Sequence, residues 1–319
     1  MVDEGAARPL KLIVGASYFD LTENVGERET FLRLKSLMDG RHSLDAIATR
    51  VGLDLSDVIN IVDRFDDLGL LRQERPTALI SAPDFKIRLD DTLTMWRNQI
   101  GYHRLFQSLA AGEVRREVLQ GTFLEAYHLV LAAPRHIATA VAAADSDHCR
   151  RLLAGYFAEE HDHSTYLLNT CVELGVPADA VRASHPIVGT ESLIQMLCAI
   201  GRADTLAYIA ALALFEAAPT DGAEGQRSAL QISQSYGLDA LVFGSALEHL
   251  QIDVDAKHSS LLHEALEEYE FIPADRVHGI VNLLHDLKHA YDQMHDGILL
   301  YYGDISNYVP RPKVDYFAL

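Results

Sequence analysis

The sequence predicts a mainly α-helical protein with a small α+β module at its N-terminus. From residue 84 onward, apolar residues recur at the spacing of amphipathic helices, and most interruptions fall at Pro and Gly residues. Before that point, Leu10–Leu21 is rich in β-branched and aromatic residues, which favour strands, and three short helical patterns follow it. We therefore expect a helical bundle preceded by a separate small module.

The first module has the element order of a winged-helix-like domain. One or two short strands in Leu10–Leu21 precede helical patterns at residues 30–38, 43–51 and 55–68. Small strands combined with three short helices are typical of a winged helix. Residues 1–75 are assigned to this domain.

The remaining residues divide into a linker, a bundle and a tail. Residues 76–84 contain two Pro residues and are expected to link the domains. Residues 85–302 are assigned to the bundle, and residues 303–319 to an irregular tail. Helices are expected at residues 84–100, 102–131, 134–143, 146–174, 187–218, 223–235, 238–268 and 274–302.

Charge and composition exclude several classes of function. The chain has 319 residues, with 46 Asp and Glu against 27 Lys and Arg, which gives a formal charge of −19. Proteins bind phosphate backbones through clustered Lys and Arg, so no nucleic acid is expected as a partner. The same acidic balance argues against an anionic membrane surface. The most apolar run, Leu193–Ala218, is interrupted by charged residues and is expected to be a buried helix.

The cysteine pattern and the N-terminus indicate a cytoplasmic protein. The three Cys residues have no C-x-x-C spacing, and each lies in a helical pattern. This usage is expected in a reducing compartment, without disulfides or thiolate metal sites. The first residues also lack the charged and then apolar pattern of a secretory signal.

Acidic and imidazole residues recur on predicted apolar helix faces. Glu160 and His163 lie at i, i+3 on the face that carries Phe157. Glu125 and His128 repeat the Glu-x-x-His pattern in an earlier helix. Buried charge is costly unless it is paired, and a metal ion is the usual partner of such pairs inside helical bundles.

Two later helical segments add further candidates for metal binding. Glu216 ends an apolar run, and Asp255 and His258 lie in phase with apolar residues of their helix. The predicted metal ligands are Glu125, His128, Glu160, His163, Glu216, Asp255 and His258. His161 is the alternative to His163, and Glu159 the alternative to Glu160. Glu216 could equally end a helix, and His128 could equally be a hydrogen-bonded core residue.

This mixture of carboxylate and imidazole donors favours iron or manganese. Both metals accept oxygen and nitrogen ligands in octahedral geometry and leave positions open for dioxygen. Zinc is expected with fewer carboxylates, and calcium without His. The chain contains 15 His residues, a composition expected if several of them are ligands.

The N-terminal segment 8–75 carries a set of short motifs. They are Phe31-Leu-x-Leu, Leu37-Met-Asp-Gly40, Ser43-Leu-Asp-Ala-Ile47-Ala and Phe65-x-x-Leu-Gly-Leu-Leu71. This pattern resembles the PqqD-like peptide-recognition domain of pathways that modify ribosomally made peptides. The resemblance implies that residues 8–75 bind a peptide, or a peptide-tethered substrate, as an added strand. A winged helix used for packing or dimerisation is the alternative.

The helical region carries a second set of motifs. Gln251-Ile-Asp-Val-Asp255-Ala-Lys-His258 resembles the His-x3-Asp-x2-His helix of the heme-oxygenase-like diiron oxidases and oxygenases, and Leu124-Glu-Ala-Tyr-His-Leu-Val130 and Glu159-Glu-His-Asp-His also look like family segments. The resemblance spans residues 84–302. It implies a heme-oxygenase-like bundle, two Fe(II) ions and O2 as co-substrate, and related bundles often form homodimers.

One position departs from the family pattern. Gln251 stands where the family has its first His, and an amide oxygen is a weaker ligand than an imidazole. Gln251 and His161 are therefore expected as weak ligands or as neighbours of the ligands. A site with one metal, with two, or with none stays open.

Three functions are compatible with these observations. The first is a non-heme iron oxidase or oxygenase of natural-product or modified-peptide biosynthesis, which receives its substrate from the N-terminal domain. The second is a metal-free enzyme like the pyrroloquinoline-quinone synthase and thiaminase relatives, which use side chains as acids and bases. The third is a non-catalytic scaffold that binds a peptide.

Overall fold

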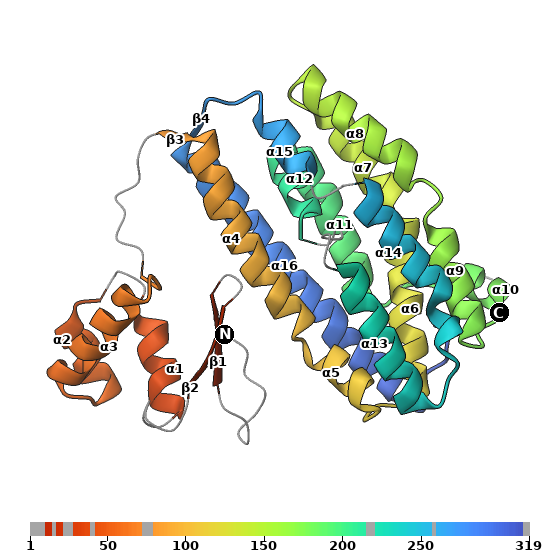
Figure 1. Ribbon diagram of the computed structural model, residues 1–319, viewed down its shortest axis with the longest axis horizontal. Helices are drawn as coiled ribbons and strands as arrows, with labels where there is room; N and C mark the ends of the chain where they lie inside the picture. Colours follow the sequence, from red (N-terminus) through yellow and green to blue (C-terminus); the bar gives the residue numbers. More distant parts are fainter. Residues whose placement is uncertain are drawn as a thin grey trace. The chain divides into compact units, whose positions relative to one another are not determined.

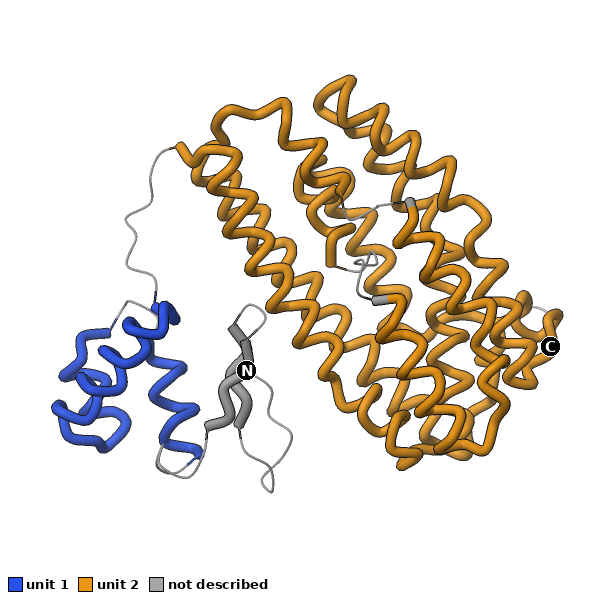
Figure 2. The backbone as a smooth tube through the Cα atoms, viewed as in Figure 1, with its two compact units in different colours: residues 1–77 blue, residues 78–319 orange. Residues whose placement is uncertain are grey.

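The chain is divided into two compact units. The structure, a computed structural model, describes residues 10–14, 17–21, 28–38, 42–71, 79–214, 221–256 and 260–314. The first unit is Met1–Thr77 and the second is Ala78–Leu319 (Figure 2). They are described in turn.

The first unit contains a hairpin and three short helices. Strands β1 (Leu10–Val14) and β2 (Ser17–Leu21) pair antiparallel, with Leu10 opposite Leu21. The helices are α1 (Arg28–Leu37), α2 (Leu44–Val51) and α3 (Leu55–Asp67). These elements confirm a small helical module, but they do not establish a winged-helix arrangement.

Local signals explain where α2 begins and ends. The Ser43 hydroxyl accepts a hydrogen bond from the backbone N–H of Ala46 at 3.2 Å, which caps the N-terminus. At the other end, Gly52 has φ = +77°, a left-handed conformation that glycine adopts without steric cost. Ile47 of this helix packs with Leu34 and Val58 in a small core.

The second unit is a helical bundle with one short two-stranded ribbon. Its helices are α4 (Ala82–Gly101), α5 (Arg104–Ala111), α6 (Arg116–Leu131), α7 (Ala133–Ala143), α8 (Asp147–Glu160), α9 (Ser164–Glu173), α10 (Ala178–Ala183), α11 (Val188–Ala203), α12 (Thr205–Leu212), α13 (Asp221–Tyr236), α14 (Gly244–Ala256), α15 (Leu261–Leu266) and α16 (Ala274–Gly303), with a 3-10 turn, η2, at Ala240–Phe243. The bundle predicted from the helical periodicity is confirmed.

Two helices organise the core of the bundle. Every residue of α12 is buried, which matches a sequence without a polar face. α16 has 30 residues, so at 1.5 Å per residue it is about 45 Å long. α16 packs against α4, α6, α11 and α12, and Figure 1 shows α4 lying along it.

The ribbon corrects the expected linker. Strands β3 (Leu79–Ser81) and β4 (Phe271–Pro273) pair antiparallel and join the starts of α4 and α16. Residues 79–84, expected as linker, are therefore β3 and the first turn of α4. Pro83 lies in that first turn, where its missing N–H costs no helical hydrogen bond.

Several expected helices are divided in the structure. The segment 102–131 breaks at Gly112, which has φ = +67°. The segment 187–218 breaks at Asp204, whose carboxylate caps α12 by accepting from the Ala207 N–H at 2.9 Å. Hydrophobic periodicity runs through both positions, so it does not reveal these breaks.

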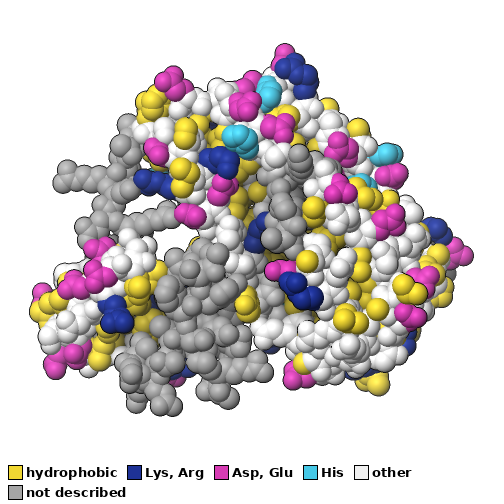
Figure 3. Space-filling model, in the orientation of Figure 1, with side chains coloured by type: hydrophobic (Ala, Val, Ile, Leu, Met, Phe, Trp, Pro, Cys, Tyr) yellow, Lys and Arg dark blue, Asp and Glu magenta, His cyan; other side chains and the backbone are white. Residues whose placement is uncertain are grey.

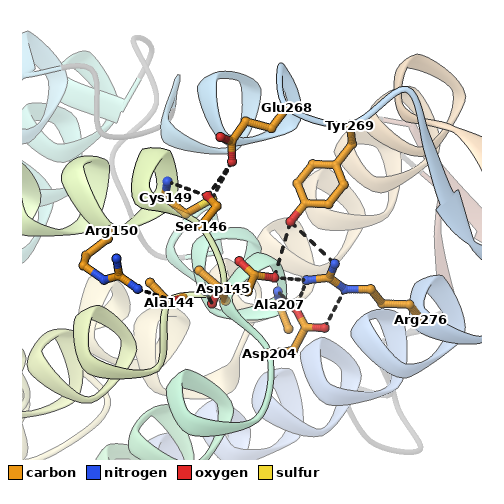
Figure 4. Close-up of polar contacts among 11 residues, drawn as sticks. Ala144, Asp145, Ser146, Cys149, Arg150, Asp204, Ala207, Glu268, Tyr269 and Arg276 are labelled. Atoms are coloured by element: carbon orange, nitrogen blue, oxygen red, sulfur yellow. Dashed lines mark hydrogen bonds and ion pairs between the residues drawn. The ribbon is translucent and has the colours of Figure 1, made fainter.

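An ion-pair network at the start of α16 joins three segments that connect helices or strands: the segment between α7 and α8, the segment between α11 and α12, and the segment between α15 and β4 (Figure 4). The Arg276 guanidinium donates to both carboxylate oxygens of Asp204, at 2.8 and 3.1 Å, and to Asp145 at 3.0 Å. The Tyr269 ring lies 5.4 Å from the guanidinium carbon. Hydrogen bonds to Asp204 raise the pKa of Arg276, so the network contains a permanent cation.

The tail packs on the bundle over its described residues. The His185 N–H donates to the Arg311 carbonyl at 2.9 Å, and Ser184 forms a β-bridge with Pro312. The Arg311 side chain donates to the carbonyl of Pro186. The connection between α10 and α11 is thereby covered by the tail.

Acidic side chains, with fewer basic ones among them, are spread over the face of the molecule in Figure 3. Among the described residues, no helix combines the length and the apolar character that crossing a membrane requires.

Candidate metal centre

A break between α8 and α9 brings Glu160 and His163 together. Glu160 is the last residue of α8, and His163 immediately precedes α9. The Glu160 Oε2 and His163 Nδ1 atoms lie 3.1 Å apart, and both residues are 5% exposed. The inward orientation predicted for this pair is confirmed, although the two residues end one helix and precede the next instead of sharing a continuous helix.

α14 supplies an imidazole and a second carboxylate. His249 and Asp253 lie one turn apart on this helix, and His249 Nδ1 is 3.3 Å from Asp253 Oδ2. α14 packs against α9 (Figure 1), and Asp253 Oδ1 is 3.7 Å from His163 Nδ1. Asp253 therefore lies against both imidazoles.

Glu160, His163 and His249 have the geometry of a metal-binding group. Each offers one ligand atom, and these atoms lie within 4.8 Å of one another. The ring centroids of the two imidazoles are 4.9 Å apart, and the rings are nearly perpendicular. The centroid of the Tyr166 ring lies 6.1 Å from that of His163 and 5.9 Å from that of His249. Two His and one carboxylate are the donor set of many non-heme iron sites.

The charges of this cluster also suit a cation. Glu160 and Asp253 are both buried carboxylates, and like charges in a buried site repel one another unless a cation is present. With neutral imidazoles, the four side chains carry a charge that one divalent ion would neutralise. The residues present therefore fit a divalent metal.

Glu125, a predicted ligand, lies in a different environment. Its carboxylate is fully buried and accepts hydrogen bonds from the Ile187 N–H, at 3.1 and 3.3 Å, and from the Tyr302 hydroxyl at 2.5 Å. Burial raises the pKa of Glu125, and these hydrogen bonds oppose the rise. Among the described residues, the metal-binding group does not include Glu125.

His128 is likewise occupied by the protein. Its Nε2 lies 2.8 Å from the hydroxyl of Ser184, which donates its own proton to the Val181 carbonyl at 2.6 Å. The hydroxyl oxygen must then accept from the Nε2–H of His128. Burial lowers the pKa of His128 to about 4, so the ring is neutral at pH 7. This is the hydrogen-bonded core role that the sequence left open.

The predicted phase of α14 is wrong. Gln251 and Asp255 are exposed, and the Gln251 amide donates to Asp255 at 2.9 Å. The inward residues are His249 and Asp253, two positions earlier. Two residues correspond to a rotation of about 200° around a helix, so this shift reverses the buried and exposed faces.

One further candidate lies outside the group, and two are not described by the structure. His161 is exposed and its Nδ1–H donates to the Ala158 carbonyl at 2.9 Å. Glu216 and His258 lie outside the described residues, so their role as ligands stays a prediction.

The sequence did contain a signal for the missed residues. His249-Leu-Gln-Ile-Asp253 satisfies the His-x3-Asp part of the motif with a true His but has Ala256 at the position of its last His, whereas the frame that begins at Gln251 keeps His258 and lacks the first His. Each frame therefore departs from the motif at one position, and the structure turns His249 and Asp253 inward.

Comparison with known proteins agrees with the helical fold. The chain is similar to a domain with a heme oxygenase-like fold from Shewanella denitrificans, with a TM-score of 0.57 and 17% identity over 72% of this chain and 98% of that one. It is also similar to a TenA family transcription regulator from Silicibacter sp. (TM-score 0.49, 14% identity, 69% of this chain and 97% of that one). A TenA homolog from Pseudomonas syringae pv. tomato gives a TM-score of 0.44 and 14% identity over 72% of this chain and 96% of that one. The predicted heme-oxygenase-like fold is confirmed by the first of these structures.

Sequence comparison defines the family. No curated protein matches the chain significantly. The family model for TENA/THI-4/PQQC proteins matches residues 90–269, which begin after the N-terminal module, so the PqqD-like resemblance stays a prediction. Since the match covers more than half of the chain, the chain belongs to the TENA/THI-4/PQQC family.

Proposed function

We propose that the chain is a non-heme iron enzyme that uses dioxygen, with Glu160, His163 and His249 as the core of its iron site. The observation that carries the proposal is the buried group of two imidazoles and one carboxylate within 4.8 Å of one another. Zinc or calcium fits this donor set less well than iron, because a second carboxylate, Asp253, lies beside both imidazoles.

The chain's own residues prepare the site for a cation. Asp253 lies 3.3 Å from the Nδ1 of His249 and 3.7 Å from the Nδ1 of His163. A carboxylate beside a metal-binding imidazole fixes the orientation of the ring and makes it more basic. Tyr166 packs its ring against both imidazoles and so restricts their movement.

Ferrous iron with open coordination positions would bind dioxygen and oxidise a C–H, N–H or C–C bond of a substrate. Burial of Glu160, His163 and Asp253 keeps bulk water away from that reaction. We propose two Fe(II) ions, as in the oxidases that the sequence resembles. A second ion needs ligands beyond these four side chains.

Iron reconstitution tests the proposal with a matched pair of variants. Asp253→Asn and Asp255→Asn make the same chemical change two residues apart on opposite faces of α14. The full-length protein would be loaded anaerobically with Fe(II), desalted, analysed for iron and exposed to O2 while its absorption spectrum is recorded. We expect the wild type and Asp255→Asn to retain iron and to change spectrum.

His163→Gln, His249→Gln and Asp253→Asn should lose iron or bind it about 10- to 100-fold more weakly. Circular dichroism would confirm that each variant is folded. A wild-type protein that binds no iron, or an Asp253→Asn variant that binds it unchanged while Asp255→Asn does not, would overturn the assignment.

Family membership favours a second candidate, a metal-free enzyme of the PqqC and TenA type. In that case Glu160, His163, His249 and Asp253 would exchange protons with a bound small molecule. Activity that survives complete removal of metal but depends on these side chains would support this candidate over the first.

For the N-terminal unit, we propose peptide binding by strand addition to the β1–β2 hairpin. Among the described residues, the hairpin has two strands, so each strand has one edge available for main-chain hydrogen bonds. A short precursor peptide encoded beside the gene is the ligand to test. Full-length protein mixed with that peptide should show slower amide hydrogen exchange in residues 10–21, and unchanged exchange there would contradict the proposal.

A further inference from the structure

A pair of exposed His residues on α16 has the geometry of a chelating site. His285 and His289 lie one turn apart, and their Nε2 atoms are 3.2 Å apart. The two rings are nearly perpendicular, with centroids 4.5 Å apart. Both side chains are exposed, so an ion could reach them from solvent.

The nitrogen separation matches the spacing of two ligands on one ion. Imidazole nitrogens bind zinc and similar ions at about 2.0–2.1 Å, which places two of them about 2.9 Å apart at an octahedral angle and about 3.3 Å apart at a tetrahedral angle. The observed 3.2 Å lies within this interval. An ion could bind with only small movements of either ring.

A carboxylate and an aromatic ring lie beside the pair. Asp292 Oδ2 lies 3.8 Å from the Nδ1 of His289, on the side of the ring away from the Nε2 atom that faces His285. A carboxylate at the second nitrogen is the usual companion of a metal-binding imidazole. The other imidazole, His285, has its ring centroid 5.6 Å from that of Trp96 on α4.

The charges around the pair nearly balance. Lys288 forms an ion pair with Asp292 at 2.6 Å and opposes a cation, whereas Asp286 and Asp292 favour one. Burial and the neighbouring His289 lower the pKa of His285. Binding would therefore depend on the two nitrogen ligands more than on the local field.

We propose that His285 and His289 form a second metal site, at the surface of α16, for a divalent transition ion of the zinc, nickel and copper group. Imidazole pairs favour these ions, with Cu(II) bound most tightly in the series. The site shares no residue with the buried Glu160 group. An ion bound here would link two successive turns of α16, which is the longest described helix. These turns belong to a helix that packs against α4.

The single Trp of the chain provides the assay, because Trp96 lies against His285. Full-length protein, first treated with a chelator and desalted, would be titrated with Cu(II) while Trp fluorescence is followed. We expect saturable quenching of Trp96, with one ion per chain in the His163→Gln background. A strong chelator, added afterwards, should remove the copper and restore emission.

The variant His289→Gln removes one ligand without touching Trp96. Loss of chelation should weaken Cu(II) binding about a hundredfold, because the second nitrogen then no longer acts at high effective concentration. His278→Gln is the matched control, since His278 is also an exposed His of α16 but lies seven residues before His285. It should titrate like the wild type.

Titration in a His163→Gln background separates this site from the buried one. The proposal holds if quenching persists there and is lost when His289→Gln is added. It is overturned if the wild type shows no saturable quenching, because the pair is then a hydrogen bond between neutral imidazoles. It is also overturned if His289→Gln quenches like the wild type. These outcomes do not depend on whether the buried group binds iron.

Discussion

The substitution Glu125→Gln distinguishes a buried structural carboxylate from a metal ligand. Glu125 resembles Glu160 in sequence, because each begins a Glu-x-x-His pattern on a buried helix face. In the structure, however, two donors, the Ile187 N–H and the Tyr302 hydroxyl, point at its oxygens. We expect iron binding to be unchanged in Glu125→Gln and the stability of the bundle to fall.

The magnitude follows from the donors that must be satisfied. Gln keeps one carbonyl oxygen and replaces the other oxygen by an NH2 group, which can only donate. If the NH2 group faces the Ile187 N–H, two donors meet and no hydrogen bond forms. If it faces Tyr302, the hydroxyl must turn in order to accept. Leaving one buried donor or acceptor without a partner costs about 1–3 kcal/mol. Urea unfolding followed by the fluorescence of Trp96, which is 6% exposed in the bundle, measures this loss.

The pH dependence gives an independent check on the same residue. Burial raises the pKa of Glu125 above its ordinary value, so the folded protein holds this proton more tightly than the unfolded chain. The associated stability is fully present below the ordinary pKa and is lost as pH rises through the raised one. The difference in unfolding free energy between the wild type and Glu125→Gln should therefore be larger at low pH. A variant that loses iron, or a difference that does not change with pH, would refute this account of Glu125.

Three further predictions concern packing, the ion-pair network and a buried imidazole. Gly121→Ala should lower the free energy of unfolding in urea by about 1–3 kcal/mol, because the added Cβ would lie 2.2 Å from the Tyr302 ring and overpack the core. In the control Gly155→Ala, the added Cβ meets nothing within 4 Å, so this variant should not be destabilised. Arg276→Gln should cost about 1–3 kcal/mol, because the variant loses charged hydrogen bonds to Asp204 and Asp145; Arg182→Gln, which breaks only the exposed pair with Asp179, should leave the unfolding midpoint unchanged. Burial lowers the pKa of His136 to about 4, so the stability that its neutral ring contributes is present above its ordinary pKa of 6.5 and is lost as pH falls toward 4. His136→Phe, which also removes the 2.6 Å hydrogen bond to Tyr208, should weaken the pH dependence of unfolding between these values.

The sequence was most informative where periodicity and polar spacing agreed. The bundle follows from long amphipathic patterns, and α12 follows from an apolar run without a polar face. Glu160 and His163 were placed inward because they lie in phase with apolar neighbours, and the structure buries both. The helix break between them was not visible, since apolar residues continue on either side of it.

The phase of α14 could not be fixed from its pattern. Leu247 and Leu250 are both half-buried, so apolar residues occur on more than one side of the helix and do not define a single buried face. Acidic residues at 253 and 255 then offer two frames that differ by about 200°. The His-x3-Asp spacing of His249 and Asp253 favours the first frame, but only if this spacing is given more weight than the positions of the apolar residues. Tertiary contact with α9 is what selects the inward face.

The remaining ambiguity, between Glu125 and Glu160, lies in the partners of each carboxylate and not in its spacing. A buried carboxylate that faces N–H and O–H donors has its charge stabilised by the protein, as Glu125 does through Ile187 and Tyr302. A buried carboxylate that lies beside two imidazoles meets groups that can themselves bind a metal, as Glu160 does with His163 and His249, and Asp253 lies beside both of these imidazoles. Protonating both imidazoles or binding one divalent ion would each neutralise that second cluster. Because ligand atoms of Glu160, His163 and His249 lie within 4.8 Å of one another, one metal ion could bind all three, and for this reason we propose Glu160 for the metal site and a structural role for Glu125.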